Sequence, residues 1–134
     1  MSGTARKDVC VAAAIIIDDG RVLATQRGYG PYEGWWEFPG GKVEPHEAPD
    51  QAVCREILEE LDAQVEVERH FMHVSHDYPE FHLEMDCFLC RLVDEEFTLR
   101  EHHAAKWLDS AHLRNVEWLP ADADVILALE KLLG

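Results

Sequence analysis

The hydrophobic pattern of the chain begins with a nearly continuous apolar run at residues 9–17, which is rich in Val, Ile and Ala. A run of this kind predicts a buried strand. Gly20 then supplies the positive φ of a hairpin turn, and residues 21–27 are predicted to return as a second strand. Because Asp8 interrupts the charge pattern and the apolar run is short, we expect a strand here and not a signal peptide.

Two later segments repeat apolar residues with the period of a helix. Residues 49–61 predict the first helix, and Pro49 suits its first turn, where the missing N–H costs nothing. Its predicted buried face carries Val53, Ile57, Leu58 and Leu61. Residues 121–133 follow Pro120 and predict the final helix. Its apolar stripe consists of Val125, Ile126, Leu129 and either Leu132 or Leu133.

The rest of the chain predicts strands and turns. Residues 64–77 and 81–94 show partial two-residue alternation, and a Tyr-Pro-Glu sequence joins them. The other expected elements are a loop at 28–34, a strand at 35–38, a Pro-Gly-Gly turn directly before the first helix, a polar loop at 97–103, an edge strand at 104–108 and a helical turn at 109–113 capped by Asp109. Without a repeat or a linker, residues 1–134 predict a single mixed α/β domain.

The charge balance narrows the class of partner. The 134 residues carry a formal net charge of −15. A nucleic-acid duplex or an anionic membrane needs a basic face, so neither is an expected partner. An anionic nucleotide stays compatible with this charge if metal ions are the dominant local charges. No stretch is long enough to span a membrane. The four cysteines lack the density of a disulfide scaffold, so we expect a protein of the reducing cytoplasm.

Two residue pairs have the spacing of zinc half-sites, but neither is expected to bind zinc. Cys87 and Cys90 are three residues apart, as are His73 and His76, and each pair lies in a predicted strand. Residues three apart in a strand point to opposite faces. We therefore expect ordinary core or surface side chains at these positions.

The first predicted helix carries an unusual cluster of charge. Glu56, Glu59 and Glu60 fall within an arc of roughly 100° at ~100° per residue. Like charges at i and i+4, such as Glu56 and Glu60, destabilise a helix by roughly 0.2–0.5 kcal/mol. A bound cation would explain the cluster. Hard divalent cations take carboxylate oxygens, and Mg²⁺ usually arrives with a phosphate substrate.

These carboxylates belong to a spaced motif. Five residues separate Gly41 from Glu47, and seven more precede Arg55, which starts the run Arg-Glu-Ile-Leu-Glu-Glu. The motif resembles the Nudix box, G-x5-E-x7-R-E-U-x-E-E-x-G-U. Residues 36–44, the end of the second strand and residues 118–122 resemble the MutT branch, which includes the CTP and 5-methyl-dCTP pyrophosphohydrolases. Asp62 stands where the box has its late glycine, and Asp takes the left-handed conformation less readily than Gly.

The resemblance implies a fold and a reaction. The fold is the Nudix α/β/α sandwich with a mixed sheet, a catalytic loop-helix-loop and a C-terminal helix. Such enzymes use water and Mg²⁺ or Mn²⁺, because metal ions neutralise a polyphosphate and lower the pKa of water. The expected reaction converts a nucleoside triphosphate to its monophosphate and diphosphate. A cytidine-type or modified nucleotide is favoured, with 8-oxo-dGTP close behind.

The resemblance also implies roles for residues near the motif. Glu56, Glu60 and the Gly40 carbonyl would bind metal, with Glu59 beside them in both the metal-binding and the catalytic set. Arg55 would pair with Glu47 and orient these carboxylates, although more direct chemistry stays open. Glu101, in the polar loop before Trp107, would bind a metal or act as general base. Glu95 and Glu96 are weaker substitutes for Glu101, and His102 and His103 are expected to face solvent.

Five residues are expected to bind the substrate. Arg27 resembles the arginine that meets substrate phosphate, for which a guanidinium offers two parallel donors. Glu37 and Phe38 belong to the segment of the MutT resemblance, and the Phe38 backbone rather than its ring would meet the base if the ring is in the core. Phe81 could stack on the base or belong to the strand core. Asp122 would accept hydrogen bonds from amino groups of the base, such as N4 of cytosine. Alternatively, its charge would only interact favourably with the dipole at the start of the last helix.

Two rival functions remain open from the sequence. One is a dinucleotide or nucleotide-sugar diphosphatase. The other is a non-catalytic nucleotide-binding regulator, against which the complete set of Glu56, Glu59 and Glu60 speaks. The sequence does not choose between a monomer and a homodimer.

Overall fold

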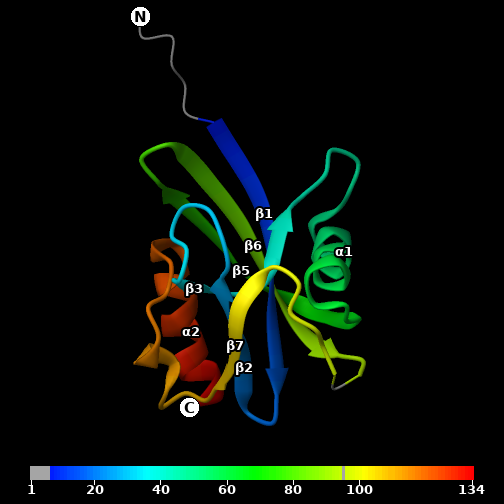
Figure 1. Ribbon diagram of the computed structural model, residues 1–134, viewed down its shortest axis with the longest axis vertical. Helices are drawn as coiled ribbons and strands as arrows, with labels where there is room; N and C mark the ends of the chain where they lie inside the picture. Colours follow the sequence, from blue (N-terminus) through cyan, green and yellow to red (C-terminus); the bar gives the residue numbers. More distant parts are fainter. Residues whose placement is uncertain (1–6, 95) are drawn as a thin grey trace, which may run out of the picture.

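The computed structural model describes residues 7–94 and 96–134. Two α-helices and seven strands make up most of this part of the chain (Figure 1). In order they are β1 (Lys7–Asp18), β2 (Arg21–Arg27), β3 (Trp36–Glu37), β4 (Gly40–Lys42), α1 (Pro49–Leu61), β5 (Val65–Asp77), β6 (Phe81–Leu92), β7 (His102–Leu108), the 3₁₀-helices η1 (Leu113–Asn115) and η2 (Pro120–Asp122), and α2 (Ala123–Leu133).

The strands form a mixed sheet around β1. The order along the sheet is β3-β2-β1-β6-β5, with β4 paired to β1 and β7 paired to β2. β1 and β6 run parallel, whereas the other pairings are antiparallel. β7 pairs with β2 alone among the described strands, which confirms the predicted edge strand. The Asp19–Gly20 turn has positive φ at both residues, as expected for a two-residue hairpin.

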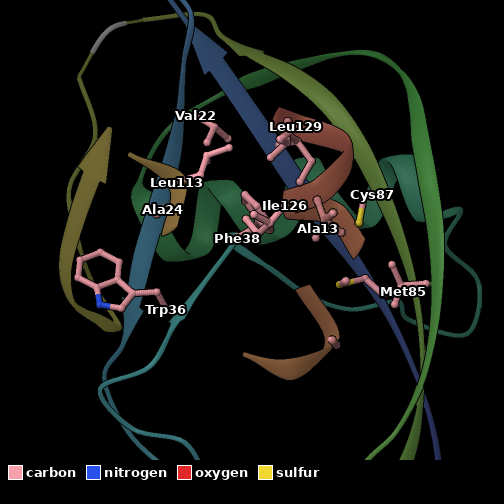
Figure 2. Close-up of a cluster of buried hydrophobic side chains, with 14 of the residues drawn as sticks. Ala13, Val22, Ala24, Trp36, Phe38, Met85, Cys87, Leu113, Ile126 and Leu129 are labelled. Carbon is pink, nitrogen blue, oxygen red and sulfur yellow. The ribbon is translucent and has the colours of Figure 1, made fainter. Parts of the chain in front are cut away.

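β1 carries apolar residues on both of its faces because a helix covers each face. Ala13 and Ile15 belong to the core under α2, whereas Ala12, Ala14 and Ile16 belong to the core under α1. Figure 1 shows the sheet between the two helices, and Figure 2 shows Ile126 and Leu129 of α2 within the first core. The predicted α/β/α sandwich with a C-terminal helix is confirmed.

α1 begins and ends where the sequence predicts. Pro49 is its first residue, and Asp62 ends it in the left-handed conformation with φ 52°, donating its N–H to the Leu58 carbonyl. Asp62 therefore performs the turn that the motif glycine normally makes, and Arg100 lies 3.2 Å from its carboxylate. The expected burial of Leu58 was wrong. This side chain is exposed because the buried stripe is narrower and includes Ala52 and Glu60 instead.

Four other local predictions were wrong. The segment before α1 is not a single turn, since Gly40–Lys42 pairs with β1 as β4 and a loop separates it from Pro49. The polar loop is shorter than expected because His102 and His103 already belong to β7. The helical turn after Asp109 forms later, as η1, although Asp109 does accept a hydrogen bond from the His112 amide. Residues 120–122 form η2 before the α-helix begins at Ala123.

The cysteines and histidines with zinc-like spacing point apart, as predicted. Cys87 lies in the core under α2 and Cys90 in the core under α1. His73 contacts Asp86, whereas His76 contacts the ring of Tyr78. All four cysteines are free thiols. Among the described residues, no helix combines the length and apolar content needed to cross a membrane.

Candidate active site

Arg55 holds together the carboxylates on one side of α1. Its Nε and Nη2 donate to the two carboxylate oxygens of Glu47 at 2.7 and 2.9 Å. Its Nη1 donates to Glu56 at 2.9 Å and to Glu59 at 3.2 Å, and Nη2 also reaches the Lys42 carbonyl at 2.9 Å. The hydrogen bonds from Arg55 lower the pKa of Glu47 to about 2. The expected pairing of Arg55 with Glu47 is present, and its catalytic consequence stays a prediction.

Glu60 is the most buried carboxylate of α1, with 8% of its surface exposed. Burial is the main cause that raises its pKa to about 9, and the charges of Glu56, Glu101 and Glu37 add to it. Burial also raises the pKa of Glu56, although the hydrogen bond from Arg55 opposes the shift. Three acidic side chains, from α1, from the segment before β7 and from β3, therefore repel the charged form of Glu60.

Two glycines allow the backbone of β4 to approach its neighbours. A Cβ on Gly40 would lie 2.1 Å from the Ala12 carbonyl oxygen, and a Cβ on Gly41 would lie 2.4 Å from the carboxyl carbon of Glu56. No side chain fits at Gly40, where the neighbour is backbone, and a side chain at Gly41 would displace the Glu56 carboxylate. The Gly40 amide also donates to Oε2 of Glu60 at 3.2 Å. The glycines of the motif thus bring the backbone against the carboxylates of α1.

Glu101 joins this cluster from the segment before β7. Its side chain is exposed, yet its charge raises the pKa of both Glu56 and Glu60, which places it near them. A Cβ on Gly28 would lie 2.1 Å from the Glu101 carbonyl oxygen, so Gly28 fixes how closely this backbone approaches β2. Of the substitutes considered for Glu101, Glu96 is exposed and Glu95 lies outside the described residues.

Glu37 lies between the carboxylate cluster and the C-terminal part of the fold. Burial raises its pKa, and the Arg27 charge opposes the shift. Arg27 Nε and His102 Nε2 each lie 3.9 Å from Oε2 of Glu37. The charge of Glu37 also raises the pKa of Glu60 on one side and of Asp122 on the other. Two of the predicted substrate residues, Arg27 and Glu37, are therefore neighbours.

Asp122 is buried beyond Glu37, at the C-terminal end of η2, and 4% of its surface is exposed. Burial, followed by the Glu37 charge, raises the pKa of Asp122 well above its usual value. Its side chain makes no capping hydrogen bond to α2, which weakens the interpretation as a helix-dipole residue. A buried acid without a capping role is a candidate for ligand recognition.

The two candidate aromatic residues differ in position. Phe38 is buried and stacks on Trp118 with ring centroids 4.6 Å apart, so its ring belongs to the core and not to a base-stacking surface. A backbone contact from Phe38 to substrate stays a prediction. Phe81 is only partly buried and stacks on Tyr78 with centroids 4.9 Å apart. Phe81 can therefore still present part of its ring to a ligand.

The chemistry of the carboxylate cluster fits a hard cation. Carboxylate oxygens are the donors that such ions take, and a cation relieves the repulsion that raises the pKa of Glu56 and Glu60. As they stand, no three His, Cys, Asp or Glu side chains in residues 7–94 and 96–134 form a group that could hold a metal ion. Arg55 engages two of these carboxylates, which accounts for part of this arrangement.

The comparison with protein families decides the identity of the fold. A family described as the NUDIX domain matches residues 11–128, which is most of the chain and includes the whole motif. The chain belongs to the Nudix family. Nudix hydrolases generally use divalent metal ions, and the expected family, fold and enzyme class are thereby confirmed.

Relatives within the Nudix family carry names of nucleotide hydrolases. The chain is 37% identical to an 8-oxo-dGTP diphosphatase of Proteus vulgaris over 95 residues, which cover 69% of this chain and 85% of the relative. It is 34% identical to a CTP pyrophosphohydrolase of Escherichia coli over 129 residues, covering 94% of each.

Solved structures agree with this assignment. The E. coli ORF135 protein superposes with a TM-score of 0.80 at 31% identity, covering 95% of this chain and 91% of that one. The MutT protein of Methanosarcina mazei superposes with a TM-score of 0.85 at 23% identity, covering 97% and 98%, and so supports the fold alone.

The structure brings two further residues to the candidate site, and the sequence interpretation missed both. His102 was expected to face solvent, but its side chain is 5% exposed and its Nδ1 has no hydrogen-bond partner among the described residues. Starting the two-residue alternation of β7 at His102 would have indicated this burial. Tyr78 was treated only as part of a turn, yet it is buried against Phe81 and Ala121. Nothing in its local sequence indicates a contact with residue 121.

Proposed function

We propose that this Nudix hydrolase is a Mg²⁺-dependent nucleoside triphosphate pyrophosphohydrolase. It would convert a nucleoside triphosphate and water to the nucleoside monophosphate and diphosphate, and so remove unwanted nucleotides from the cytoplasmic pool. The observation that carries the proposal is the continuity of the site. Glu37 couples electrostatically to Glu60 in the carboxylate cluster and to the buried Asp122. A nucleoside triphosphate has a charged triphosphate at one end, which suits the carboxylate cluster with bound metal, and a base at the other, which suits Asp122.

The carboxylate cluster is assigned to the triphosphate end. Glu56, Glu60, the Gly40 carbonyl and Glu59 would hold Mg²⁺, for which Mn²⁺ can substitute. Bound there, the ions neutralise phosphate charge and favour ionisation of the attacking water. Glu101 lies near these groups and is assigned as the base that accepts the water proton. Arg55 orients Glu56 and Glu59 and is itself held by Glu47.

Arg27 is assigned to substrate phosphate. Its guanidinium is partly exposed and lies 3.9 Å from Glu37, too far for a strong hydrogen bond. A phosphate offers it two acceptors at once. Glu37, left without that partner, would then contact the nucleoside between the phosphates and the base.

Asp122 is assigned to the edge of the base. Burial favours its neutral carboxyl, which offers one donor and one acceptor side by side. Cytosine presents a ring-nitrogen acceptor beside its N4 amino donors, so a neutral carboxyl matches it. Cytidine-type triphosphates, including modified ones, are therefore the favoured substrates. The similarity to 8-oxo-dGTP diphosphatases makes 8-oxo-dGTP the second candidate.

A substrate panel tests the assignment. Canonical triphosphates, 5-methyl-dCTP, 8-oxo-dGTP, a dinucleoside polyphosphate and a nucleotide sugar are each incubated with the protein and Mg²⁺, and diphosphate and phosphate are quantified separately. Diphosphate from a cytidine-type nucleotide or from 8-oxo-dGTP is expected. Phosphate without diphosphate would contradict the cleavage site, and turnover of only the last two compounds would favour the rival diphosphatase. Nucleotide binding without any turnover would favour a non-catalytic regulator.

Asp122 is tested by two substitutions in the same assay. Asp122→Asn keeps one donor and one acceptor and is expected to retain the nucleotide preference within about threefold. Asp122→Leu keeps the branched shape but removes both groups, and it is expected to lower discrimination by roughly 5- to 150-fold, since a paired base contact is worth about 1–3 kcal/mol. An unchanged preference in Asp122→Leu would remove this residue from the base site.

A further inference from the structure

We infer that Tyr78 is a positioning residue for the base end of the site, which fixes Phe81 and Asp122 relative to each other. Tyr78 lies between β5 and β6, whereas Asp122 lies 44 positions later at the end of η2. The inference rests on the proposed function, because it assigns these two residues to the nucleobase. It adds a residue that neither the motif nor the sequence interpretation includes.

Tyr78 contacts Phe81 directly and reaches Asp122 through the preceding residue, Ala121. Its ring stacks on Phe81 with centroids 4.9 Å apart and an interplanar angle of 27°. Its backbone N–H donates to the Phe81 carbonyl at 2.9 Å, which closes the hairpin turn. Its hydroxyl accepts a hydrogen bond from the Ala121 N–H at 3.2 Å, directly before Asp122. The side chain is buried, so these contacts are made away from water.

The hydrogen bond to Ala121 meets a need of η2. The first N–H groups of a helix have no partner within it, and a side chain at the N-cap usually satisfies one of them. The N-cap residue here is Leu119, which makes no such bond. Ala121 is buried, so an unpaired N–H would be costly. The Tyr78 hydroxyl therefore supplies the cap from a distant part of the chain.

The charges around the hydroxyl are consistent with this role. Burial raises the pKa of Tyr78, the Ala121 hydrogen bond opposes the shift, and the nearby Asp122 and Tyr32 add to it. The hydroxyl therefore stays neutral, and it lies close to the Asp122 carboxyl. Removal of the hydroxyl would leave the Ala121 N–H without this hydrogen-bond acceptor. η2 would then be free to shift relative to the Phe81 ring.

This geometry predicts a specific kinetic effect. The contacts of Tyr78 involve the base end, whereas the carboxylates of α1 and Glu101 act at the phosphates. Loss of the hydroxyl should therefore weaken binding of the preferred nucleotide and the discrimination against others, with little change in kcat. A purely structural residue would instead change kcat or KM for every nucleotide alike. Loss of the buried hydrogen bond to Ala121 lowers stability in either case, so the kinetic pattern makes the distinction.

Tyr78→Phe tests the inference, with Tyr32→Phe as the matched control. The first variant keeps the ring that stacks on Phe81 and deletes only the hydroxyl. Tyr32 belongs to the same aromatic cluster, since its ring centroid lies 5.6 Å from that of Tyr78. Kinetics are measured with dCTP, 5-methyl-dCTP, 8-oxo-dGTP, dTTP and dATP. Tyr78→Phe is expected to raise KM for the preferred nucleotide at least fivefold and to keep kcat within twofold, whereas Tyr32→Phe stays within twofold in both.

The possible outcomes separate the inference from the function on which it rests. Equal losses for all nucleotides in Tyr78→Phe, or a result equal to that of Tyr32→Phe, would overturn the role of Tyr78 and leave the proposed function intact. Failure of the wild-type protein to hydrolyse any nucleotide would overturn the proposed function. Amide hydrogen exchange at Ala121 in the wild type is independent of the variants. Slow exchange is expected, and exchange as fast as in an open loop would overturn the hydrogen bond.

Discussion

The backbone amide of Gly40 donates a hydrogen bond to Oε2 of Glu60 at 3.2 Å, and this contact joins β4 to α1. It is one of few favourable contacts for a carboxylate that is buried among other acids. Burial and the charges of Glu56, Glu101 and Glu37 raise the pKa of Glu60. Without a cation the folded protein therefore carries an electrostatic cost at this position.

Glu60→Gln is expected to stabilise the metal-free protein at pH 8. Because the folded pKa of Glu60 lies above its usual value of 4.5, folding binds a proton and stability falls as the pH rises from about 4.5 toward 9. Gln removes this dependence, so the gain should be several degrees in Tm at pH 8 and small at pH 5, at roughly 4 °C per kcal/mol. Differential scanning calorimetry in EDTA measures both.

The exposed Glu59 provides the control for this experiment. Glu59→Gln removes the same charge from the same helix, but its side chain is 59% exposed, so the gain in Tm should be much smaller. Added Mg²⁺ should raise the Tm of the wild type more than that of Glu60→Gln. A Glu60→Gln variant that is less stable than the wild type at pH 8 in EDTA would refute the electrostatic account.

Gly28→Ala is expected to impair catalysis through Glu101. The new Cβ would lie 2.1 Å from the Glu101 carbonyl oxygen, so this backbone must move. A displacement of about 1 Å at a catalytic group can cost about 100-fold in rate. Steady-state kinetics should show a loss in kcat of this order.

Gly30→Ala is the control for Gly28→Ala, because a Cβ at Gly30 meets no atom within 4 Å. Its φ of +74° makes the substitution strained, by about 1–2 kcal/mol. Gly30→Ala should therefore lose stability and keep its kcat. Equal kcat values for the two variants would contradict the proposed position of Glu101.

Arg55→Lys should lower activity by roughly 10- to 100-fold, the usual effect of removing a residue that orients metal ligands. Lysine keeps the charge but cannot bond Glu47 and Glu56 in the same planar geometry. Arg114→Lys is the matched control, since Arg114 makes a similar two-point pair with Glu130 away from the site. Kinetics that are as insensitive to Arg55→Lys as to Arg114→Lys would restrict Arg55 to a structural role.

The outer face of β5 and β6 predicts a pH dependence of stability. The hydrogen bond that His73 donates to Glu84 raises the pKa of His73, and hydrogen bonds to Asp77 and then Glu84 raise the pKa of His82. The hydrogen bonds that Glu84 accepts from His73, Ser75 and His82 lower its own pKa to about 2. The histidine contribution is complete below about 6.5 and is lost as the pH rises through the folded pKa values. The Glu84 contribution is complete above 4.5 and is lost as the pH falls toward 2.

The histidine and Glu84 contributions are both complete between about pH 4.5 and 6.5. The Tm of the wild type should therefore exceed that of Glu84→Gln by the largest margin in this range. The groups are exposed, so the difference should shrink in high salt. Glu80→Gln removes a carboxylate from the tip of the same hairpin and should show no such maximum. Thermal melts across pH 3–9 provide the comparison. A difference that does not vary with pH would contradict the network.

The sequence predicted those parts of the fold that depend on local signals. Pro49 and the spacing of Val53, Ile57 and Leu61 define α1 without reference to the rest of the chain. β4 was missed because Gly-Gly-Lys has no strand propensity of its own. It forms a strand because only glycine can approach Ala12 so closely. Leu58 was misplaced because Glu60 occupies part of the face that the pattern assigned to apolar residues.

The candidate site likewise contains some contacts that the sequence predicted and others that it did not. The motif places Arg55, Glu47 and the carboxylates of α1 together because one helix and its adjacent loop carry them. Contacts between distant segments could not be predicted from one sequence. The approach of Gly28 to Glu101 and the bond from Ala121 to Tyr78 depend on how β7 and η2 dock on the sheet.

The most direct test of the account measures diphosphate release from the preferred nucleoside triphosphate as Mg²⁺ is titrated, for the wild type and for Glu60→Gln. The wild type should be inactive in EDTA and should saturate with Mg²⁺. Glu60→Gln should need at least tenfold more Mg²⁺ and reach a lower kcat. Changing a residue that only orients metal ligands already costs roughly 10- to 100-fold, and Glu60 is assigned as a ligand. Identical Mg²⁺ curves for the two proteins would contradict the claim that this carboxylate cluster is the metal centre of a nucleotide hydrolase.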